Sequence, residues 1–154
     1  MMATIHLPSR QRGVAAVEMG ILLVPLVLLV FGITEYGRAM YQYNAIAKGV
    51  RSAVRHLSEQ SSGDSTEIDI AKCLVVYGNT GCTGSPQVPG LTKTMVSVCD
   101  TSSCPSTHLN QPTGSGVVNL VTVSVAGCPF TSLVPTVVPN ITFGTIAATM
   151  RQVT

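Results

Sequence analysis

The sequence is poor in charged and aromatic residues. Of its 154 residues, 10% are charged and 5% aromatic, whereas 45% are hydrophobic, and a soluble domain usually carries about a quarter charged residues. Part of the chain is therefore expected to avoid water. The formal net charge of +2 is far from the basic footprint that phosphate backbones need, so no nucleic-acid partner is expected. The length excludes a large multidomain enzyme and fits one modest domain with an appendage.

The usual patterns of metal, redox and cofactor sites are also missing. No C-x-x-C pair occurs, and His6, His56 and His108 are scattered along the chain, which argues against a zinc site. Cys99 and Cys104 are separated by four residues rather than the two of thioredoxin-like motifs. There is no dinucleotide fingerprint and no phosphate-binding loop. The sequence therefore predicts no catalytic residues, no cofactor, no metal and no enzymatic activity.

A long apolar run near the N-terminus is the first positive signal. Residues 14–33 are interrupted only by Glu18 and Pro25, and a helix of that length spans a hydrocarbon layer of about 30 Å. We predict a transmembrane helix. A buried core helix is one alternative, but so small a chain cannot surround an all-apolar cylinder. A cleaved secretory signal is another, but its apolar region would be shorter and would end promptly at a small-x-small site.

The orientation of this helix is not decided by nearby positive charges. Arg10 and Arg12 precede the apolar run, and Arg38, Lys48 and Arg51 follow it, so the positive-inside rule gives no clear answer. The cysteines are more informative, because all of them follow the run in a region rich in Gly, Ser, Thr and Pro, typical of exported domains braced by disulfides. We expect the C-terminal head to lie outside the cytoplasm.

Glu18 is the sharpest feature of the apolar run. A carboxylate at the centre of a membrane helix costs about 2.5–3.5 kcal/mol on insertion scales, less near the boundary, and it usually has a partner. If the chain were cut after Gly13, the new amino group of Val14 would lie one helical turn from Glu18. The alternative is an acid that snorkels at the interface of an ordinary anchor. Pro25 lacks the N–H that would bond the carbonyl of Ile21, which predicts a local bend or loosened turn.

The run Gly13-Val14-Ala15-Ala16-Val17-Glu18, the apolar stretch with Pro25, and the segment 31–39 form a combined pattern. Over residues 9–57 this pattern resembles the N-terminus of TadE/TadF-like minor pilins (pseudopilins) of the tight-adherence pilus (Tad/Flp, type IVb). The segments 73–79, 89–91 and 147–151 are similar to TadE-like tails. The resemblance implies that a prepilin peptidase cuts the Gly13–Val14 bond and that Glu18 and Pro25 serve assembly. Met19 departs from the tyrosine that commonly follows the acid in processed pilins of this class.

The resemblance also implies a function and a set of partners. The protein would be a non-enzymatic minor pilin that helps to assemble an adhesion pilus. Its partners would be the prepilin peptidase, the major Flp pilin and other minor pilins, the inner-membrane Tad platform and the lipid bilayer. It would cross the bacterial inner membrane once, with a cytoplasmic N-terminus and a periplasmic head, and then enter the fibre or only prime it. The alternatives are an unprocessed single-pass scaffold of the same secretion machinery and a membrane-tethered thiol oxidoreductase.

A stripe of apolar residues continues beyond the apolar run at steps of three and four. This spacing predicts one helix that continues over residues 34–57 and extends roughly 65 Å from residue 14. We expect the head to pack on part of the stripe and a neighbouring pilin helix on the rest. Tyr36, Tyr41 and Tyr43 suit the lipid headgroup level, and Glu35 with Arg38 forms an i,i+3 pair. The stripe consists of Ile33, Tyr36, Met40, Tyr43, Ala47, Val50, Val54 and Leu57.

The remaining residues, 58–154, predict a small head domain after a leader (1–13), a membrane helix (14–33) and its continuation (34–57). Residues 67–77 fit a short amphipathic helix, and 94–99, 117–126 and 141–150 fit strands. Prolines keep the segment between the last two strands irregular. A small antiparallel sheet backed by the long helix is expected, an α+β fold with a pilin-like head.

The spacing of the cysteines favours two local disulfides, Cys73 with Cys82 and Cys99 with Cys104. Cys128 would then be unpaired or linked to another chain. Two bridges among five cysteines permit fifteen arrangements, five choices times three, so the sequence leaves the pairing open. Each bridge would stabilise the small head by about 2–4 kcal/mol, mainly by restricting the unfolded chain.

Overall fold

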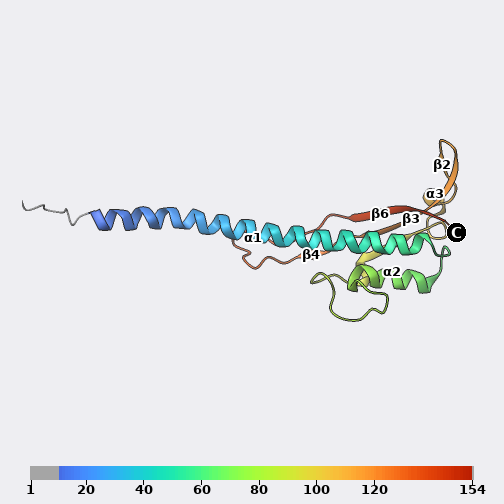
Figure 1. The fold of residues 1–154 in the computed structure, drawn as a ribbon, viewed down its shortest axis with the longest axis horizontal. Helices are drawn as coiled ribbons and strands as arrows, with labels where there is room; N and C mark the ends of the chain where they lie inside the picture. The colour runs from blue at the N-terminus through green and yellow to red at the C-terminus, as the bar shows by residue number, and fades with distance from the viewer. Residues whose placement is uncertain (1–10, 154) are drawn as a thin grey trace, which may run out of the picture.

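One long helix dominates the computed structural model, which describes residues 11–153 (Figure 1). Helix α1 (Gln11–Ser58) has 48 residues, and at 1.5 Å per residue it is about 70 Å long. The head packs along its C-terminal half and leaves the N-terminal half uncovered. The prediction of a single continuous helix is confirmed. Residues 1–10 of the predicted leader lie outside the described residues.

Helix α2 (Ser65–Tyr77) runs beside the C-terminal half of α1, and its ends are set by local sequence signals. The Asp64 carboxylate accepts hydrogen bonds from the backbone N–H groups of Thr66 and Glu67, a typical N-cap. Gly78 ends the helix with φ of 74°, a conformation that glycine adopts without strain. The predicted helix is confirmed and begins two residues earlier than expected, because Asp64 caps it.

The sheet is antiparallel, as predicted, and is centred on β3 (Gly116–Val125). Strand β1 (Val96–Cys99), preceded by a 3-10 turn (Lys93–Met95), and strand β6 (Ile146–Gln152) pair with the same stretch of β3 and therefore lie on its two sides. The start of β3 also forms a hairpin with β2 (Gln111–Thr113), which follows the short helix α3 (Pro105–His108). The sequence predicted neither α3 nor β2.

The predicted strand over residues 141–150 is wrong as a single element. The structure divides it into β5 (Ile141–Thr142), which pairs with β4 (Pro129–Phe130), and β6, which pairs with β3. Between them, the Phe143 N–H bonds the Cys128 carbonyl, and the Phe143 ring contacts the rings of Tyr43 and Phe130. These contacts hold the first half of the segment to a separate two-stranded ribbon, and Gly144 marks the change of partner.

The hydrophobic core lies between α1, α2 and the sheet. Alternate β3 side chains point into it, as the period-two pattern predicts. On α1 the buried apolar residues begin at Ile46. The apolar contact between α1 and the rest of the head therefore extends over little more than the last three turns of the helix. The core residues from the three elements are Ile46, Val50, Ala53, Val54 and Leu57 of α1, Ala71, Val75 and Val76 of α2, and Val121, Val123 and Val125 of β3.

Candidate assembly and membrane interface

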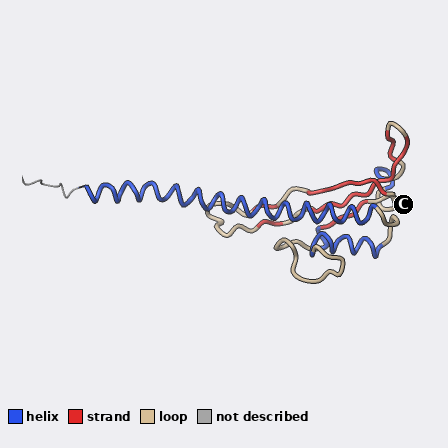
Figure 2. The backbone as a smooth tube through the Cα atoms, in the orientation of Figure 1, coloured by secondary structure: helices blue, strands red, loops and turns tan. Residues whose placement is uncertain are grey.

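The predicted membrane segment lies in the N-terminal half of α1, which extends beyond the rest of the head (Figure 2) and whose large apolar side chains are exposed. Its most apolar window of 18 residues has a mean hydropathy of 2.6, and none of that window is buried inside the protein. The helix is long and apolar enough to cross a membrane, as predicted. Continuous apolar surface of this extent marks a contact with lipid or with other proteins. Residues 14–33 therefore need a covering that this chain does not itself supply.

The residues predicted to act in cleavage and assembly all lie on this uncovered stretch. The Gly13–Val14 bond is in the first turn of α1, and Glu18 follows Val14 by four residues on the same helix face. The Glu18 side chain is exposed and makes no hydrogen bond or ion pair with the side chains described, those of residues 13–153. Pro25 is also exposed, and α1 continues through it without interruption. The structure thus keeps these residues free for contacts outside the chain.

Glu35, two residues past the apolar run, forms a buried polar junction between α1 and the head. Its Oε1 accepts a hydrogen bond from Arg38 Nη1 at 2.7 Å, and its Oε2 accepts one from the Leu133 N–H at 3.2 Å. The Arg38 guanidinium also lies 5.5 Å from the centre of the Phe130 ring, within cation–π range. Burial would raise the pKa of Glu35, but hydrogen bonds from Arg38, Ser132 and Leu133 outweigh it and hold the pKa below its ordinary value.

The apolar stripe predicted on α1 faces the head only in its second half. Ile33, Tyr36 and Met40 are exposed, whereas Glu35 and Gln42 are buried on the opposite face. The expectation that part of the stripe would pack on the head is confirmed for its distal residues, but the contact with the head nearest the membrane is polar. Apolar periodicity cannot reveal a contact made by a carboxylate and an amide, so the sequence missed this face.

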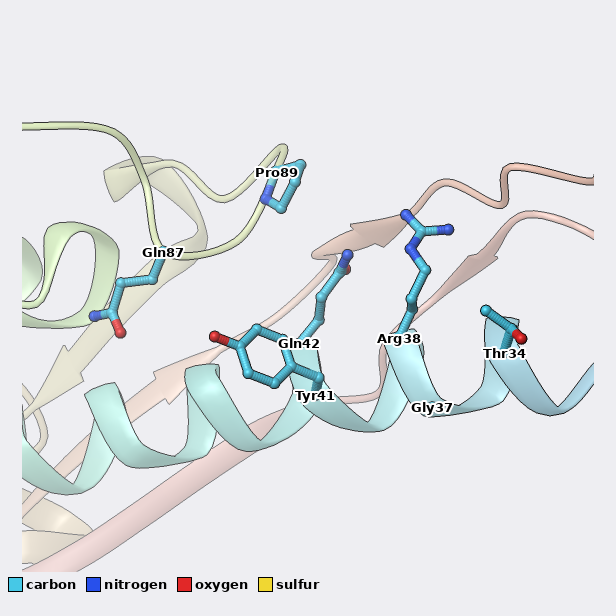
Figure 3. Close-up of a pocket in the computed structure, with 7 residues that line it drawn as sticks. All are labelled: Thr34, Gly37, Arg38, Tyr41, Gln42, Gln87 and Pro89. Carbon is cyan, nitrogen blue, oxygen red and sulfur yellow. The ribbon is translucent and has the colours of Figure 1, made fainter.

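An open groove of about 380 Å³ lies where α1 leaves the apolar run. Figure 3 shows Arg38, Tyr41 and Gln42 rising from successive turns of α1 toward the loop that carries Gln87 and Pro89. The Gln42 Oε1 is buried and has no hydrogen-bond partner among the described residues. The groove begins at Thr34, next to the predicted membrane segment, and extends along about two turns of α1 as far as Gln42.

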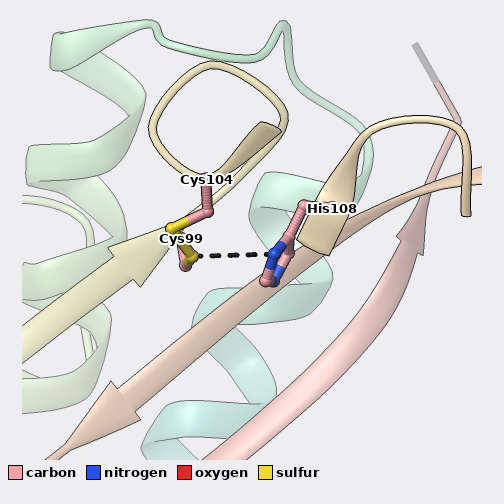
Figure 4. Close-up of side chains that lie close together, drawn as sticks. All are labelled: Cys99, Cys104 and His108. Carbon is pink, nitrogen blue, oxygen red and sulfur yellow. Dashed lines mark hydrogen bonds between the residues drawn. A yellow bond between two sulfur atoms is a disulfide. The ribbon is translucent and has the colours of Figure 1, made fainter. Parts of the chain in front are cut away.

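Both predicted disulfides, Cys73–Cys82 and Cys99–Cys104, are present, and Cys128 is free and buried. Figure 4 shows His108 beside one of them, with its Nδ1 3.6 Å from Cys99 Sγ. In the sequence His108 is isolated, because its approach to the bridge depends on the turn of α3 and on the contact of α3 with β3. The bonded sulfurs offer no thiolate, the form in which cysteine binds metals.

Taken together, the fold and its uncovered helix define a protein with one membrane-capable helix that continues into a small, disulfide-braced α+β head. Residues 13–55 match the family model described as TadE-like protein, so the predicted resemblance is confirmed over this segment. The match contains Glu18, Pro25 and Glu35 and ends three residues before the end of α1, so the whole head, residues 58–154, lies outside it. No curated protein and no solved structure matches the chain. TadE-like proteins are membrane-associated, and this segment supports an association with the Tad pilus.

Proposed function

We propose that this protein is a non-enzymatic minor pilin, or pseudopilin, that a prepilin peptidase trims before it takes part in assembling a Tad/Flp adhesion pilus. In this proposal the precursor crosses the bacterial inner membrane once, with residues 1–13 in the cytoplasm and the head in the periplasm. The peptidase, the major Flp pilin, other minor pilins and the Tad platform are its partners. The single observation that carries the proposal is the TadE-like match over residues 13–55.

The mechanism we propose is the transfer of α1 from lipid to a bundle of helices. Residues 14–33 are apolar on all sides, so they can exchange a lipid surrounding for a surrounding of other apolar helices. Glu18 is the one charged group that must change its environment on the way. An ammonium at Val14, on the same molecule or on a neighbour, would compensate its charge at a distance of one helical turn. Pro25 would let neighbouring helices adjust during packing.

The cleavage step is tested by replacing the glycine at the proposed cut. We expect Gly13→Leu to block trimming, because the peptidase would recognise the residue before the scissile bond. Gly20→Leu is the matched control, since both glycines lie on α1 with nothing within 4 Å of an added Cβ. Mass spectrometry of the N-terminus in a strain with the Tad machinery should find Val14 first in the wild type and in Gly20→Leu. Met1 as the N-terminus of the wild-type protein would support the scaffold alternative.

The role of Glu18 is tested separately from cleavage. We expect Glu18→Ala to leave trimming largely intact and to reduce surface piliation at least tenfold, because removal of a buried ion-pair partner leaves the other charge unpaired. Glu59→Ala, at an exposed acid just past α1, is the control, and cells that carry it should show normal piliation. Electron microscopy of fibres together with immunoblots of the trimmed protein measures both steps. Normal piliation of Glu18→Ala would contradict the proposed pairing.

The thiol oxidoreductase alternative has one observation in its favour, the contact between His108 and the Cys99–Cys104 bridge. An imidazole beside a disulfide can stabilise a thiolate that leaves when the bridge is attacked. However, both nitrogens of His108 already have hydroxyl partners, Thr107 Oγ1 on Nδ1 and Thr122 Oγ1 on Nε2, each at 2.8 Å. These bonds fix the ring as part of the α3–β3 contact. We therefore place this activity second.

A further inference from the structure

The loop between β4 and β5, residues 131–140, is the part of the head that reaches furthest toward the N-terminal half of α1 (Figure 1). We call it the β4–β5 loop. The Leu133 N–H in this loop bonds Glu35, which lies two residues past Ile33, or about 3 Å along the helix axis. The headgroup layer of a bilayer is about 5–7 Å thick on each side. If α1 spans a bilayer with residues 14–33 in its core, the tip of this loop lies within that layer.

The β4–β5 loop carries no charge and exposes a large apolar side chain, Leu133. Leu133 is 72% exposed, and Ile141, at the base of the loop, is 46% exposed. No Lys, Arg, Asp or Glu occurs between Asp100 and Arg151, so the loop has no ionised group to keep it in water. Valines and prolines make up half of its residues. Exposure of a leucine side chain to water costs free energy, and its transfer to a lipid interface is favourable when the segment around it carries no charge.

Five of the eight backbone N–H groups of the β4–β5 loop, including that of Leu133, donate hydrogen bonds within the protein. The N–H of Ser132 bonds Asn140 Oδ1 at 2.9 Å, and the N–H of Val134 bonds Ser132 Oγ at 3.1 Å. The N–H groups of Val137 and Val138 both bond the Val134 carbonyl. Positions 135 and 139 are prolines, which have no N–H. A loop with few free N–H groups can enter a region poor in water at little cost.

We propose that the β4–β5 loop is a second membrane contact, which inserts Leu133 into the lipid interface beside the point where α1 emerges. The occupant of this surface is the bilayer that already holds α1, because the Glu35–Leu133 hydrogen bond fixes the loop at the boundary of the apolar run. The loop would fix the orientation of the head relative to the membrane and would separate Glu35 from the lipid. This inference needs only that α1 spans a bilayer and does not depend on the pilus function.

The test uses the absence of tryptophan from the sequence, which makes an introduced indole the sole tryptophan signal. Full-length Leu133→Trp is reconstituted in phosphatidylcholine–phosphatidylglycerol vesicles whose acyl chains are brominated near the glycerol. Val117→Trp is the matched control, at another exposed apolar side chain, 62% exposed, near the β2 hairpin at the opposite end of the head. Leu29→Trp, within the apolar run, reports that α1 is inserted.

We expect Leu133→Trp to lose more than half of its emission in the brominated vesicles and to emit at shorter wavelengths than Val117→Trp, which should be nearly unaffected. Quenching of Leu29→Trp without quenching of Leu133→Trp would overturn the proposal. A shift of Leu133→Trp emission that appears only at high protein-to-lipid ratio, without quenching by bromine, would also overturn it and would identify a second protein molecule as the covering surface. The result of these quenching measurements does not depend on the cleavage and piliation assays described above, so failure of the proposed pilus function would not affect it.

Discussion

At two places in this protein a buried carboxylate joins segments that are far apart in the sequence. Glu35 connects α1 with the β4–β5 loop, and Asp100 connects the turn after β1 with the turn after α1. Both accept hydrogen bonds from backbone N–H groups of residues that are distant in the sequence. Asp100 is 3% exposed and accepts from the N–H groups of Gly63, Ser102 and Ser103 and from two serine hydroxyls. Single acidic side chains thus fix the relative positions of whole segments.

We expect Asp100→Asn to lower the free energy of unfolding by about 2–3 kcal/mol, because an amide nitrogen cannot accept these bonds and hydrogen bonds to a charged group are stronger than neutral ones. Denaturant unfolding of the full chain in detergent micelles, followed by circular dichroism, measures this. Asp69→Asn is the control, since Asp69 is exposed and pairs only with Lys93 at 3.0 Å. Its loss should stay below about 1 kcal/mol. Equal effects of the two changes would contradict the role of Asp100.

The same residue predicts a dependence on pH. Burial raises the pKa of Asp100, but hydrogen bonds from Ser103, Gly63 and Ser102 outweigh burial and hold the pKa well below its ordinary value of 3.8. Because the pKa is lower in the folded state, the stabilisation is fully present above pH 3.8 and is lost as the pH falls from there toward the folded pKa. The Asp100→Asn variant should therefore lose less stability than the wild type over that acidic range.

At the scale of elements, α1 is one helix with two environments. Its first half is apolar and uncovered, and its second half packs on α2 and the sheet. The two helices pack tightly at Gly49, where an added Cβ would lie 3.0 Å from the Val75 carbonyl oxygen and 3.1 Å from the Val75 Cα. The absence of a side chain at Gly49 therefore permits the tight contact between the two helices.

We expect Gly49→Ala to lower the free energy of unfolding by about 1–2 kcal/mol, because the backbone of α2 must shift to admit the methyl group. Gly37→Ala is the matched control on the same helix, since nothing lies within 4 Å of its added Cβ. This control should be stabilised by up to about 1 kcal/mol through its helix propensity. Thermal unfolding of both variants in micelles gives the comparison. Stabilisation of Gly49→Ala would show that the helices are less closely packed at this position.

At the scale of the whole molecule, two short disulfide loops brace a head whose apolar core is small. Cys73–Cys82 joins α2 to the turn that follows it, and Cys99–Cys104 joins β1 to the start of α3. Cys128 is 1% exposed and lies in the core, and its burial raises the pKa of the thiol. The molecule therefore contains one protected thiol and two structural bridges.

Thiol counting distinguishes this arrangement from a redox-active one. We expect no reactive thiol in the native protein, one after denaturation and five after denaturation with reduction. A chromogenic disulfide reagent applied to the full chain in micelles gives the three counts. The single thiol should disappear in Cys128→Ala and persist in Cys73→Ala with Cys82→Ala. Reduction of the native protein by a mild dithiol would instead favour the oxidoreductase alternative.

Periodicity and run length were enough to predict the long helix, the apolar run, the helix at residues 67–77 and the central strand, because these signals depend on residues close together in the chain. Cysteine spacing favoured the two local disulfides but did not exclude the other pairings. The family match covers one contiguous segment, residues 13–55, and the segments near 73–79, 89–91 and 147–151 lie outside it. The pattern of residues 14–57 was enough to place the candidate assembly residues Glu18 and Pro25 on one helix that begins at the predicted cut after Gly13.

Three features depend on contacts between segments that are far apart in the chain: which face of α1 meets the head, how residues 141–150 divide, and where the β4–β5 loop lies. Glu35 and Leu133 are 98 positions apart, and the sequence around neither residue predicts their contact. A buried polar contact leaves no hydrophobic pattern, because its stability comes from matching donors and acceptors rather than from apolar area. The proximity of His108 to Cys99 also depends on tertiary contacts, because it requires β1, α3 and β3 to lie together.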